Sequence, residues 1–165
     1  MKAMLLDTTC DLESVKTPLR FADLPTPEPN TEELLIRVSA CGVCHTEIDE
    51  IEGRTPPTSF PMIPGHEVVG TIEKRGRNVS NHSLGDTVGV GWFFSSCGRC
   101  IYCTSGAENL CASFRATGRD APGGYAEYMT VPATSAFPIP GNMDDIHTAP
   151  LLCAGAIGYR SLRLC

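Results

Sequence analysis

Four cysteines in the middle of the chain have the spacing C-x2-C-x2-C-x7-C; they are Cys97, Cys100, Cys103 and Cys111. Four thiolates this close together can fold back around one ion, and zinc suits them because it accepts a tetrahedral shell of sulfur ligands. Gly98 would allow a tight turn that brings backbone amides near the sulfurs. Since four sulfurs leave no position for a substrate, the spacing predicts a structural zinc site.

Two other uses of these cysteines remain open. The thiols could be unligated or joined in disulfides, although cytosolic proteins seldom keep disulfides and nine cysteines cannot all pair. An iron–sulfur cluster is the second alternative, but the final gap of seven residues and the absence of a proline after Cys111 differ from the ferredoxin pattern. Because the segment has little hydrophobic material, we expect bound metal to supply most of its order.

Three shorter motifs contain further side chains that bind metals or carry protons: CGVCHTE at residues 41–47, PGHE at 64–67 and LLCAG at 151–155. Each motif is weak alone, because a lone His66 is more often a surface or hydrogen-bonded histidine and a lone Cys153 is more often a small buried hydrophobe. The first motif follows a predicted strand and the second precedes one. Strand ends can bring such distant residues into one pocket.

The order of these motifs carries a specific resemblance. With GVCHT, GHE, the four-cysteine loop, GGYAEY at residues 123–128 and LLCAG in this order, the sequence resembles zinc-dependent alcohol dehydrogenases of the medium-chain dehydrogenase/reductase family. The resemblance covers nearly the whole chain and concerns the N-terminal catalytic portion of these enzymes. It implies a mainly β fold, a GroES-like barrel with short helices and a zinc-binding loop.

The resemblance also implies a division of the chain and a second metal site. Residues 1–150 would form the GroES-like catalytic domain, with the structural zinc lobe at 95–113, and residues 151–165 would form a helix leading toward an absent Rossmann domain. A catalytic zinc with an open fourth position would be held by Cys44, His66 and Cys153. Two cysteines and one histidine are the known ligands of the catalytic zinc in alcohol dehydrogenases.

Several side chains around the implied catalytic zinc match family positions. Thr46 matches the hydroxyl that accepts the proton of the substrate alcohol, and a hydroxyl suits this role because it donates and accepts at once. Glu67 matches the carboxylate that approaches the metal during ligand exchange, and Glu47 matches one that orients His66. Simpler uses remain open, with Thr46 as a helix N-terminal cap and the glutamates as solvated surface charges.

Three further positions concern the cofactor, the substrate and the proton path. His45 matches a position that faces the pyrophosphate of the cofactor, and Trp92 matches an aromatic wall of the substrate pocket, although Trp92 could equally be plain core. Many relatives carry a histidine three residues after Thr46 as the outer end of the proton path, and this sequence has Asp49 there. We therefore expect proton release through Asp49 or through water alone.

The activity that the resemblance implies is the interconversion of a small-molecule alcohol and an aldehyde or ketone with NAD or NADP, in a homo-oligomeric enzyme. The dinucleotide fingerprint G-x-G-x-x-G after a strand is absent from the chain, so we expect the chain alone to be inactive. A non-catalytic module with zinc only at the four cysteines is the alternative. A zinc hydrolase with Glu67 as general base is a third interpretation, but the histidine-rich helical motifs of that class are missing.

The elements that would position these motifs are mostly short. Glycine occurs 16 times and proline 13 times, which favours many short strands joined by turns. Strands are predicted at residues 2–6, 17–24, 33–39, 67–73, 86–90 and 124–131, and helices at 44–51, 144–146 and 151–164. The pattern predicts a mainly antiparallel, barrel-like body with a cysteine-rich excursion.

Length and charge set the outer bounds. The 165 residues suffice for one ordinary domain. The net charge of −6 and the lack of a basic run disfavour nucleic acids and anionic membranes as partners. No apolar stretch approaches the roughly 20 residues needed to cross a bilayer, and the N-terminus lacks the features of a signal peptide, so we expect a cytoplasmic protein.

Overall fold

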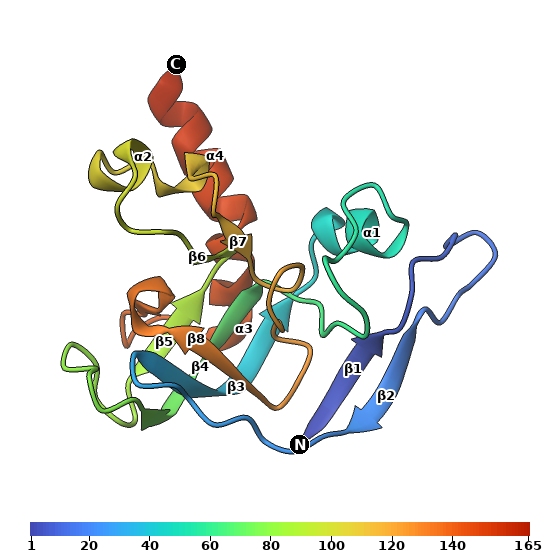
Figure 1. Cartoon of the computed structure of the whole chain (residues 1–165), viewed down its shortest axis with the longest axis horizontal. Helices are drawn as coiled ribbons and strands as arrows, with labels where there is room; N and C mark the ends of the chain where they lie inside the picture. Colours follow the sequence, from blue (N-terminus) through green and yellow to red (C-terminus); the bar gives the residue numbers. More distant parts are fainter.

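Strands make up most of the regular structure in the computed structural model, which describes residues 1–165 (Figure 1). The strands are β1 (Lys2–Leu6), β2 (Leu19–Asp23), β3 (Glu33–Gly42), β4 (Glu67–Arg75), β5 (Thr87–Val90), β6 (Phe93–Ser95), β7 (Arg115–Ala116), β8 (Tyr128–Pro132) and β9 (Phe137–Pro138). The α-helices are α1 (His45–Ile51), α2 (Ile101–Thr104), α3 (Asp145–Thr148) and α4 (Ala154–Leu164). The 3-10 helices are η1 (Glu108–Leu110), η2 (Ala133–Ser135) and η3 (Ala149–Leu152).

The largest sheet has five strands in the order β8-β3-β4-β5-β9, and every neighbouring pair is antiparallel. β-Branched residues are frequent in β4 and β5, which favours extended backbone. The central pairing of β3 with β4 ends with Gly42 opposite Glu67. This register sets the end of β3 beside the start of β4. As a consequence, Cys44 and His66 lie close together at the same end of these two central strands.

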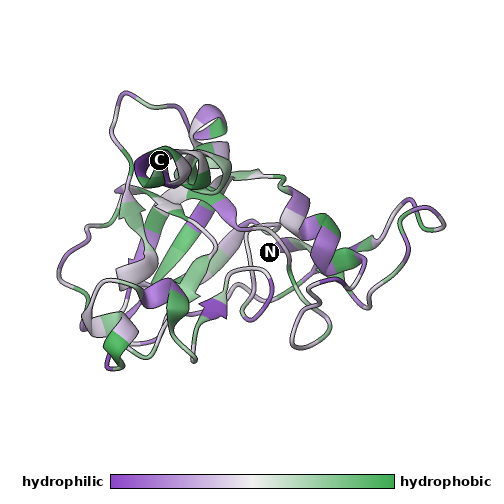
Figure 2. Cartoon of the chain, turned by 90° about the horizontal axis from the view of Figure 1, so that it is seen from above, coloured by the Kyte–Doolittle hydropathy of each residue, from purple (hydrophilic) through white to green (hydrophobic).

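The main hydrophobic core lies on one face of this sheet. Alternate residues of a strand point to the same face, as Leu34 and Ile36 do in β3 and Val88 and Val90 do in β5. They belong to a cluster of 13 buried residues that also contains Phe94 of β6. Each fully buried aliphatic side chain of this size contributes about 1.5–3 kcal/mol. Figure 2 shows the corresponding hydrophobic bands along the strands of the sheet.

Two smaller antiparallel sheets complete the body, one of β1 with β2 and one of β6 with β7. Backbone hydrogen bonds of 2.8 Å connect β1 to the rest, from Met4 N–H to Tyr125 O and from Leu6 N–H to Met62 O. The prediction of a mainly β, antiparallel, many-stranded body with short helices is therefore confirmed. The sequence did not predict β6, β7 and β9, because strands of two or three residues carry no readable pattern.

The strand predicted at residues 124–131 is wrong in its first half, since β8 begins only at Tyr128. The backbone N–H of Gly124 donates instead to the carbonyl of Gly65 at 2.9 Å. A Cβ at Gly123 would lie 2.1 Å from the same carbonyl oxygen. Glycine alone permits this close approach, so the segment supports the loop before β4 and does not extend the sheet.

The helix predicted at residues 151–164 is confirmed from Ala154 to Leu164 and is wrong only at its start, where the structure has a separate element. η3 ends at Leu152 and α4 begins at Ala154. η3 packs against β3, β4 and β5, and a Cβ at Gly89 would lie 2.7 Å from the side chain of Leu152. α4 by contrast has no buried residue and projects from the body (Figure 1). Cys153 forms the junction, because packing on the sheet and extension away from it require different directions of the chain.

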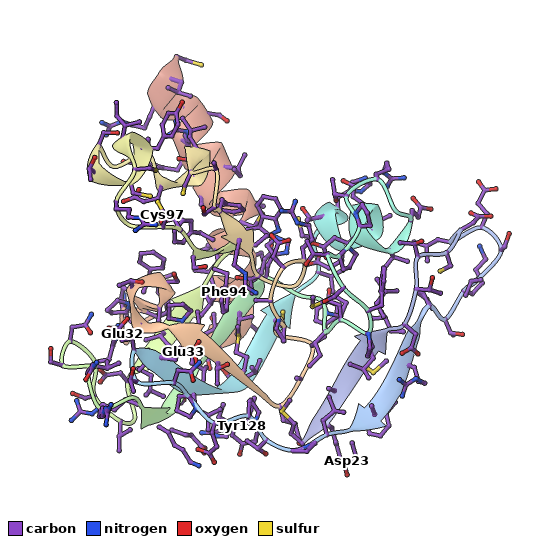
Figure 3. The ribbon with its side chains drawn as sticks, viewed as in Figure 1. Asp23, Glu32, Glu33, Phe94, Cys97 and Tyr128 are labelled. Carbon is purple, nitrogen blue, oxygen red and sulfur yellow. The ribbon has the colours of Figure 1, made fainter.

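The four-cysteine segment forms a lobe around α2 and η1 at one end of the molecule (Figure 1). In Figure 3, Phe94 marks the point where β6 belongs to the body and Cys97 lies within the lobe. Neither α2 nor η1 has a buried residue, in agreement with the low hydrophobic content of the segment.

None of the helices combines the length and the apolar character needed to cross a lipid bilayer.

Candidate active site and metal centres

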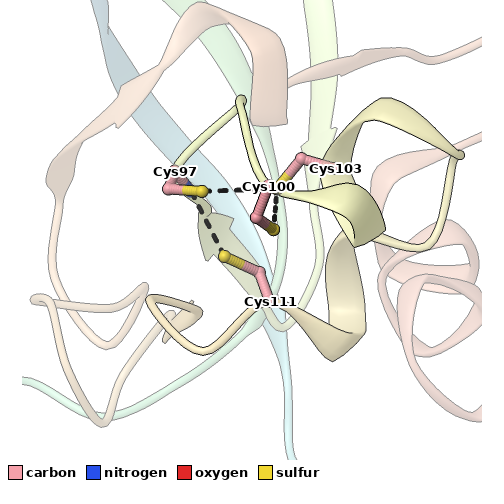
Figure 4. Close-up of side chains that lie close together, drawn as sticks. All are labelled: Cys97, Cys100, Cys103 and Cys111. Atoms are coloured by element: carbon pink, nitrogen blue, oxygen red, sulfur yellow. Dashed lines mark hydrogen bonds between the residues drawn. The ribbon is translucent and has the colours of Figure 1, made fainter.

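The four cysteines of the lobe converge on a common point (Figure 4). Cys97 precedes α2, Cys100 is the N-cap of α2, Cys103 lies within it and Cys111 follows η1. Their sulfur atoms all lie within 4.8 Å of one another. The Sγ atom of Cys103 is 3.9 Å from that of Cys97 and 3.5 Å from that of Cys100.

These distances fit a shared metal ion. In a tetrahedral shell with metal–sulfur distances of about 2.3 Å, neighbouring sulfurs lie about 3.8 Å apart, whereas a disulfide bond is about 2.05 Å long. All four cysteines are free. Gly98 adopts a φ of +69°, which allows the predicted tight turn. The backbone N–H groups of Arg99 and Cys100 lower the pKa of Cys97 to about 6, so a thiolate is favoured there.

A second group of ligand atoms forms from segments far apart in the chain. Cys44 is the N-cap of α1, His66 and Glu67 lie at the start of β4, and Cys153 joins η3 to α4. One ligand atom from each of these four residues lies within 4.8 Å of the others. The Sγ atoms of Cys44 and Cys153 are 3.9 Å apart, again close to the spacing of about 3.8 Å in a tetrahedral thiolate shell. Two sulfurs and one imidazole fit zinc, with Glu67 beside the remaining position.

The two thiols of this group differ in their electrostatics. Burial acts to raise the pKa of Cys44, but hydrogen bonds with Thr46 and Cys153 outweigh it and the pKa is lowered. Burial and the neighbouring Cys44 raise the pKa of Cys153 to about 12. The two thiols therefore differ in acidity, and Cys153 by itself stays protonated at neutral pH. A cation is needed to hold both sulfurs deprotonated, as metal binding with release of a proton does.

Glu47 connects His66 to the start of α1. Its Oε1 atom makes a close contact of 2.6 Å with His66 Nδ1, and its Oε2 atom accepts a hydrogen bond of 2.7 Å from the backbone N–H of Cys44. His66 Nε2 is buried without a hydrogen-bond partner and is left for a metal. Burial acts to lower the pKa of His66, but Glu47 more than offsets this effect and the pKa is raised.

Two glycines make room for this arrangement. A Cβ at Gly42 would lie 1.9 Å from the Oε2 atom of Glu67, so glycine leaves the space that the carboxylate fills. Gly65 has a φ of +99°, and a Cβ there would lie 2.6 Å from the ring of Tyr125. Glu47 and Glu67 are each 2% exposed and are not solvated surface charges. Burial raises the pKa of Glu67.

Thr46 lies beside the ligand thiol of Cys44. The thiol donates a hydrogen bond of 3.6 Å to the Thr46 hydroxyl. Cys44 occupies the N-cap position of α1. The simpler interpretation of Thr46 as the helix N-terminal cap is therefore wrong. The hydroxyl is therefore not committed to the helix backbone.

His45 and Asp49 lie one turn apart on the outer side of α1 and do not join the ligand atoms. The Nε2 atom of His45 is 3.7 Å from the Oδ1 atom of Asp49, and their side chains are 75% and 31% exposed. The guanidinium of Arg54 also donates a hydrogen bond to Asp49. Asp49 is thus a solvent-side carboxylate that is already paired with a cation.

Trp92 lies next to His66, with the two ring centroids 6.4 Å apart in an edge-on arrangement. The guanidinium of Arg119 lies 5.3 Å from the centroid of the Trp92 ring. Glu50 is fully buried on the same face of α1 as Glu47. Sequence reasoning missed Glu50 and Arg119. The spacing of three residues from Glu47 was a signal for Glu50, because such residues share a helix face; Arg119 had no such signal, since only tertiary contact brings its loop to Trp92.

Residues 30–141 match the model of the alcohol dehydrogenase GroES-like domain. The chain belongs to this family. The match runs from the approach to β3 to the end of β9 and confirms the predicted GroES-like fold. Within this alcohol dehydrogenase domain lie Cys44, His66 and the four-cysteine lobe, whereas Cys153 follows it.

Individual alcohol dehydrogenases show the same relationship. The chain is 48% identical over 150 residues to a probable alcohol dehydrogenase, AdhA, of Mycobacterium tuberculosis, which covers 88% of the chain and 43% of that protein. It is 33% identical to the cobalt- and zinc-bound thermostable alcohol dehydrogenase of Pyrobaculum aerophilum, with a TM-score of 0.83 and coverage of 97% and 48%. It is 27% identical to CAD of Helicobacter pylori complexed with NADP(H), with a TM-score of 0.87 and coverage of 99% and 48%. The chain spans less than half the length of these relatives.

Proposed function

We propose that the chain carries the catalytic and the structural zinc site of an alcohol dehydrogenase that interconverts a small alcohol and its aldehyde or ketone with NAD or NADP. The observation that carries the proposal is the convergence of Cys44, His66 and Cys153 where β3 ends and β4 begins. Membership of the alcohol dehydrogenase GroES-like family supports it. The metals named for the Pyrobaculum relative and the NADP(H) named for the Helicobacter relative support the choice of cofactors.

The residues of the chain prepare the site for a metal. Bound zinc would supply a Lewis acid that lowers the pKa of an alcohol hydroxyl. Glu47 Oε1 lies 2.6 Å from His66 Nδ1, and a carboxylate there favours the tautomer that keeps its proton on Nδ1 and leaves the Nε2 lone pair available. Glu67 lies beside the position that the three ligands leave open, where a carboxylate can take part in the exchange of water and substrate.

Thr46 would accept the proton of the alcohol, because its hydroxyl lies beside Cys44 and can donate onward while it accepts. Beyond Thr46, the proton would leave through Asp49 or through water. His45 would face the cofactor pyrophosphate from the exposed side of α1, and Trp92 would form a wall of the substrate pocket beside His66.

Metal analysis tests the proposal directly. We expect two zinc ions per chain, one of which exchanges readily for cobalt and gives a spectrum distinct from that of a tetrathiolate site. Cys44→Ser should lose the exchangeable ion and keep the other, and Cys165→Ser, at an exposed cysteine outside both groups, serves as the matched control. A single ion that Cys44→Ser leaves in place would overturn the proposal and establish a zinc-binding module without a catalytic metal.

A further inference from the structure

Buried polar atoms without a hydrogen-bond partner gather in one region of this chain. All such side-chain nitrogen and oxygen atoms belong to Glu47, Glu50, His66, Trp92 and Tyr125. Folded proteins leave few atoms of this kind, and each requires a physical explanation. The contact with Glu47 and the proposed zinc account for His66. They do not account for the two carboxylate oxygens of Glu50 or for the indole nitrogen of Trp92.

The surroundings of Glu50 identify the groups that face it. Its side chain is fully buried on the inner face of α1. Burial and the charge of Glu47 raise the pKa of Glu50 to about 7. His66, Arg119 and the indole of Trp92 act on this pKa in the opposite direction, because each favours the charged carboxylate. Glu50 lies on the same face of α1 as Glu47, which contacts His66, and the ring of His66 lies 6.4 Å from that of Trp92.

Glu50 and Trp92 are complementary in what each lacks. An ionised carboxylate only accepts hydrogen bonds, and an indole N–H only donates. Neither group has a hydrogen-bond partner in the chain, so a direct or water-mediated bond between them would remove two unsatisfied atoms at once. The guanidinium of Arg119 lies over the face of the same indole ring, at 5.3 Å from its centroid. A bond at the indole nitrogen would add to this contact on the ring face.

We propose that Glu50 is a positioning residue of the substrate pocket, whose carboxylate accepts the indole N–H of Trp92, directly or through water, beside His66, while Arg119 covers the face of the same ring. This proposal rests on the proposed function only in its assumption that Trp92 lines the substrate pocket. Because His66 lies 6.4 Å from Trp92, a shift of the indole changes the space next to the metal site without touching a ligand. Glu50 would therefore govern which alcohols fit, and not the proton path through Thr46.

The fluorescence of Trp92 tests the contact, because this is the only tryptophan of the chain. In Glu50→Gln at pH 8, we expect emission at longer wavelength and stronger quenching by acrylamide, since the ring loses its charged partner and gains exposure. Glu52→Gln is the matched control, because Glu52 ends the same helix but pairs with Arg54. Unchanged emission in Glu50→Gln would overturn the proposal. The zinc content of both variants reports separately on the proposed function.

A double-variant cycle separates positioning from a general effect on folding. Arg119→Met should itself shift the emission of Trp92, and Glu50→Gln added to it should cause a smaller further shift than it does alone. Additive shifts would show that Glu50 and Arg119 act on the Trp92 ring independently and would contradict the proposal. If Glu50→Gln does not fold, unchanged emission in Arg119→Met overturns the proposal. In the complete enzyme, Glu50→Gln should raise KM for the alcohol more than it lowers kcat, and an effect on kcat alone would also contradict it.

Discussion

The two groups of cysteine ligands differ in how their geometry arises. The lobe takes all four sulfurs from residues 97–111, and neither of its helices contributes a buried residue. The second group takes its atoms from three segments, and Cys44 and Cys153 are 109 residues apart. Its histidine and both carboxylates beside it are nearly fully buried. In the lobe, a metal would have to organise the chain, whereas in the second group the fold brings the ligand atoms together by itself.

This difference explains why the second site suits catalysis. A site that becomes ordered only around its ion fills every coordination position with protein ligands, as four thiolates do, and leaves none for a substrate. A site built by the register of β3 with β4 can keep a position open, because Gly42 and Gly65 leave room for the neighbouring side chains and Glu47 contacts the imidazole of His66. Five experiments test whether the two groups differ in this way.

The largest effect is expected where the metal supplies the order. Cys103→Ser should remove zinc from the lobe and abolish amide hydrogen-exchange protection over residues 97–111, since structural zinc contributes on the order of 10 kcal/mol. Protection in β3 and β4 should remain, because their core does not include the lobe. Cys165→Ser is the control. Protection of the lobe that persists without zinc would show that the two regions do not differ in this way.

If Thr46 passes the proton of the alcohol as proposed, Thr46→Val should lower kcat of the complete enzyme by about 10²–10⁴-fold, because this hydroxyl is lost. Thr46→Ser should keep most of the activity, and zinc content should be unchanged in both variants. Thr104→Val offers a control in the lobe, where the hydroxyl only bonds backbone carbonyls of α2. A kcat for Thr46→Val close to that of the unmodified enzyme would remove Thr46 from the proton path.

The buried carboxylate of Glu50 makes stability depend on pH. Its pKa is raised from 4.5 to about 7 in the folded chain, so the folded state binds the proton more tightly than the unfolded state. The stabilisation is complete below about pH 4.5 and is lost as the pH rises to about 7, by up to ~3 kcal/mol in the metal-free chain. Glu50→Gln should flatten this part of the urea-unfolding profile relative to Glu52→Gln. Parallel profiles would show that Glu50 does not titrate in this range.

Glu47→Gln should weaken zinc binding at the second site by about 10–100-fold, because the neutral amide holds His66 less firmly than the carboxylate does. The affinity of the lobe should not change. Competition with a chelator, followed through the cobalt spectrum of each site, measures both affinities in one sample. Glu108→Gln in η1 is the control. Equal weakening of both sites would contradict the independence of the two regions.

The smallest effect is expected at Asp49. Its pairs with Arg54 and His45 are partly exposed and contribute at most about 1 kcal/mol to stability, so Asp49→Ala should fold normally. If Asp49 passes the proton from Thr46, the pH–rate profile of the complete enzyme should change in Asp49→Ala. An unchanged profile would leave water as the only exit for the proton.

The residues of both sites could be named from the sequence for different reasons. The lobe was readable from spacing alone, because four ligands within 15 residues must lie close together. The separate segments of the second site became a group only through resemblance to a family. Most elements were also placed correctly, since β1 was predicted at residues 2–6 and α1 within 44–51. The errors at residues 124–131 and 151–164 occur where tertiary packing replaces a local pattern.

Which donors are present, and that the chain is a β domain with a four-cysteine lobe, follows from the amino-acid sequence, because ligand types and short spacings are local properties. Folding was needed to show that Glu47 faces His66, that Glu67 fills the space of the missing Cβ at Gly42 and that both carboxylate oxygens of Glu50 are buried without a partner. Burial, charge proximity and pKa depend on groups that only the folded register brings together.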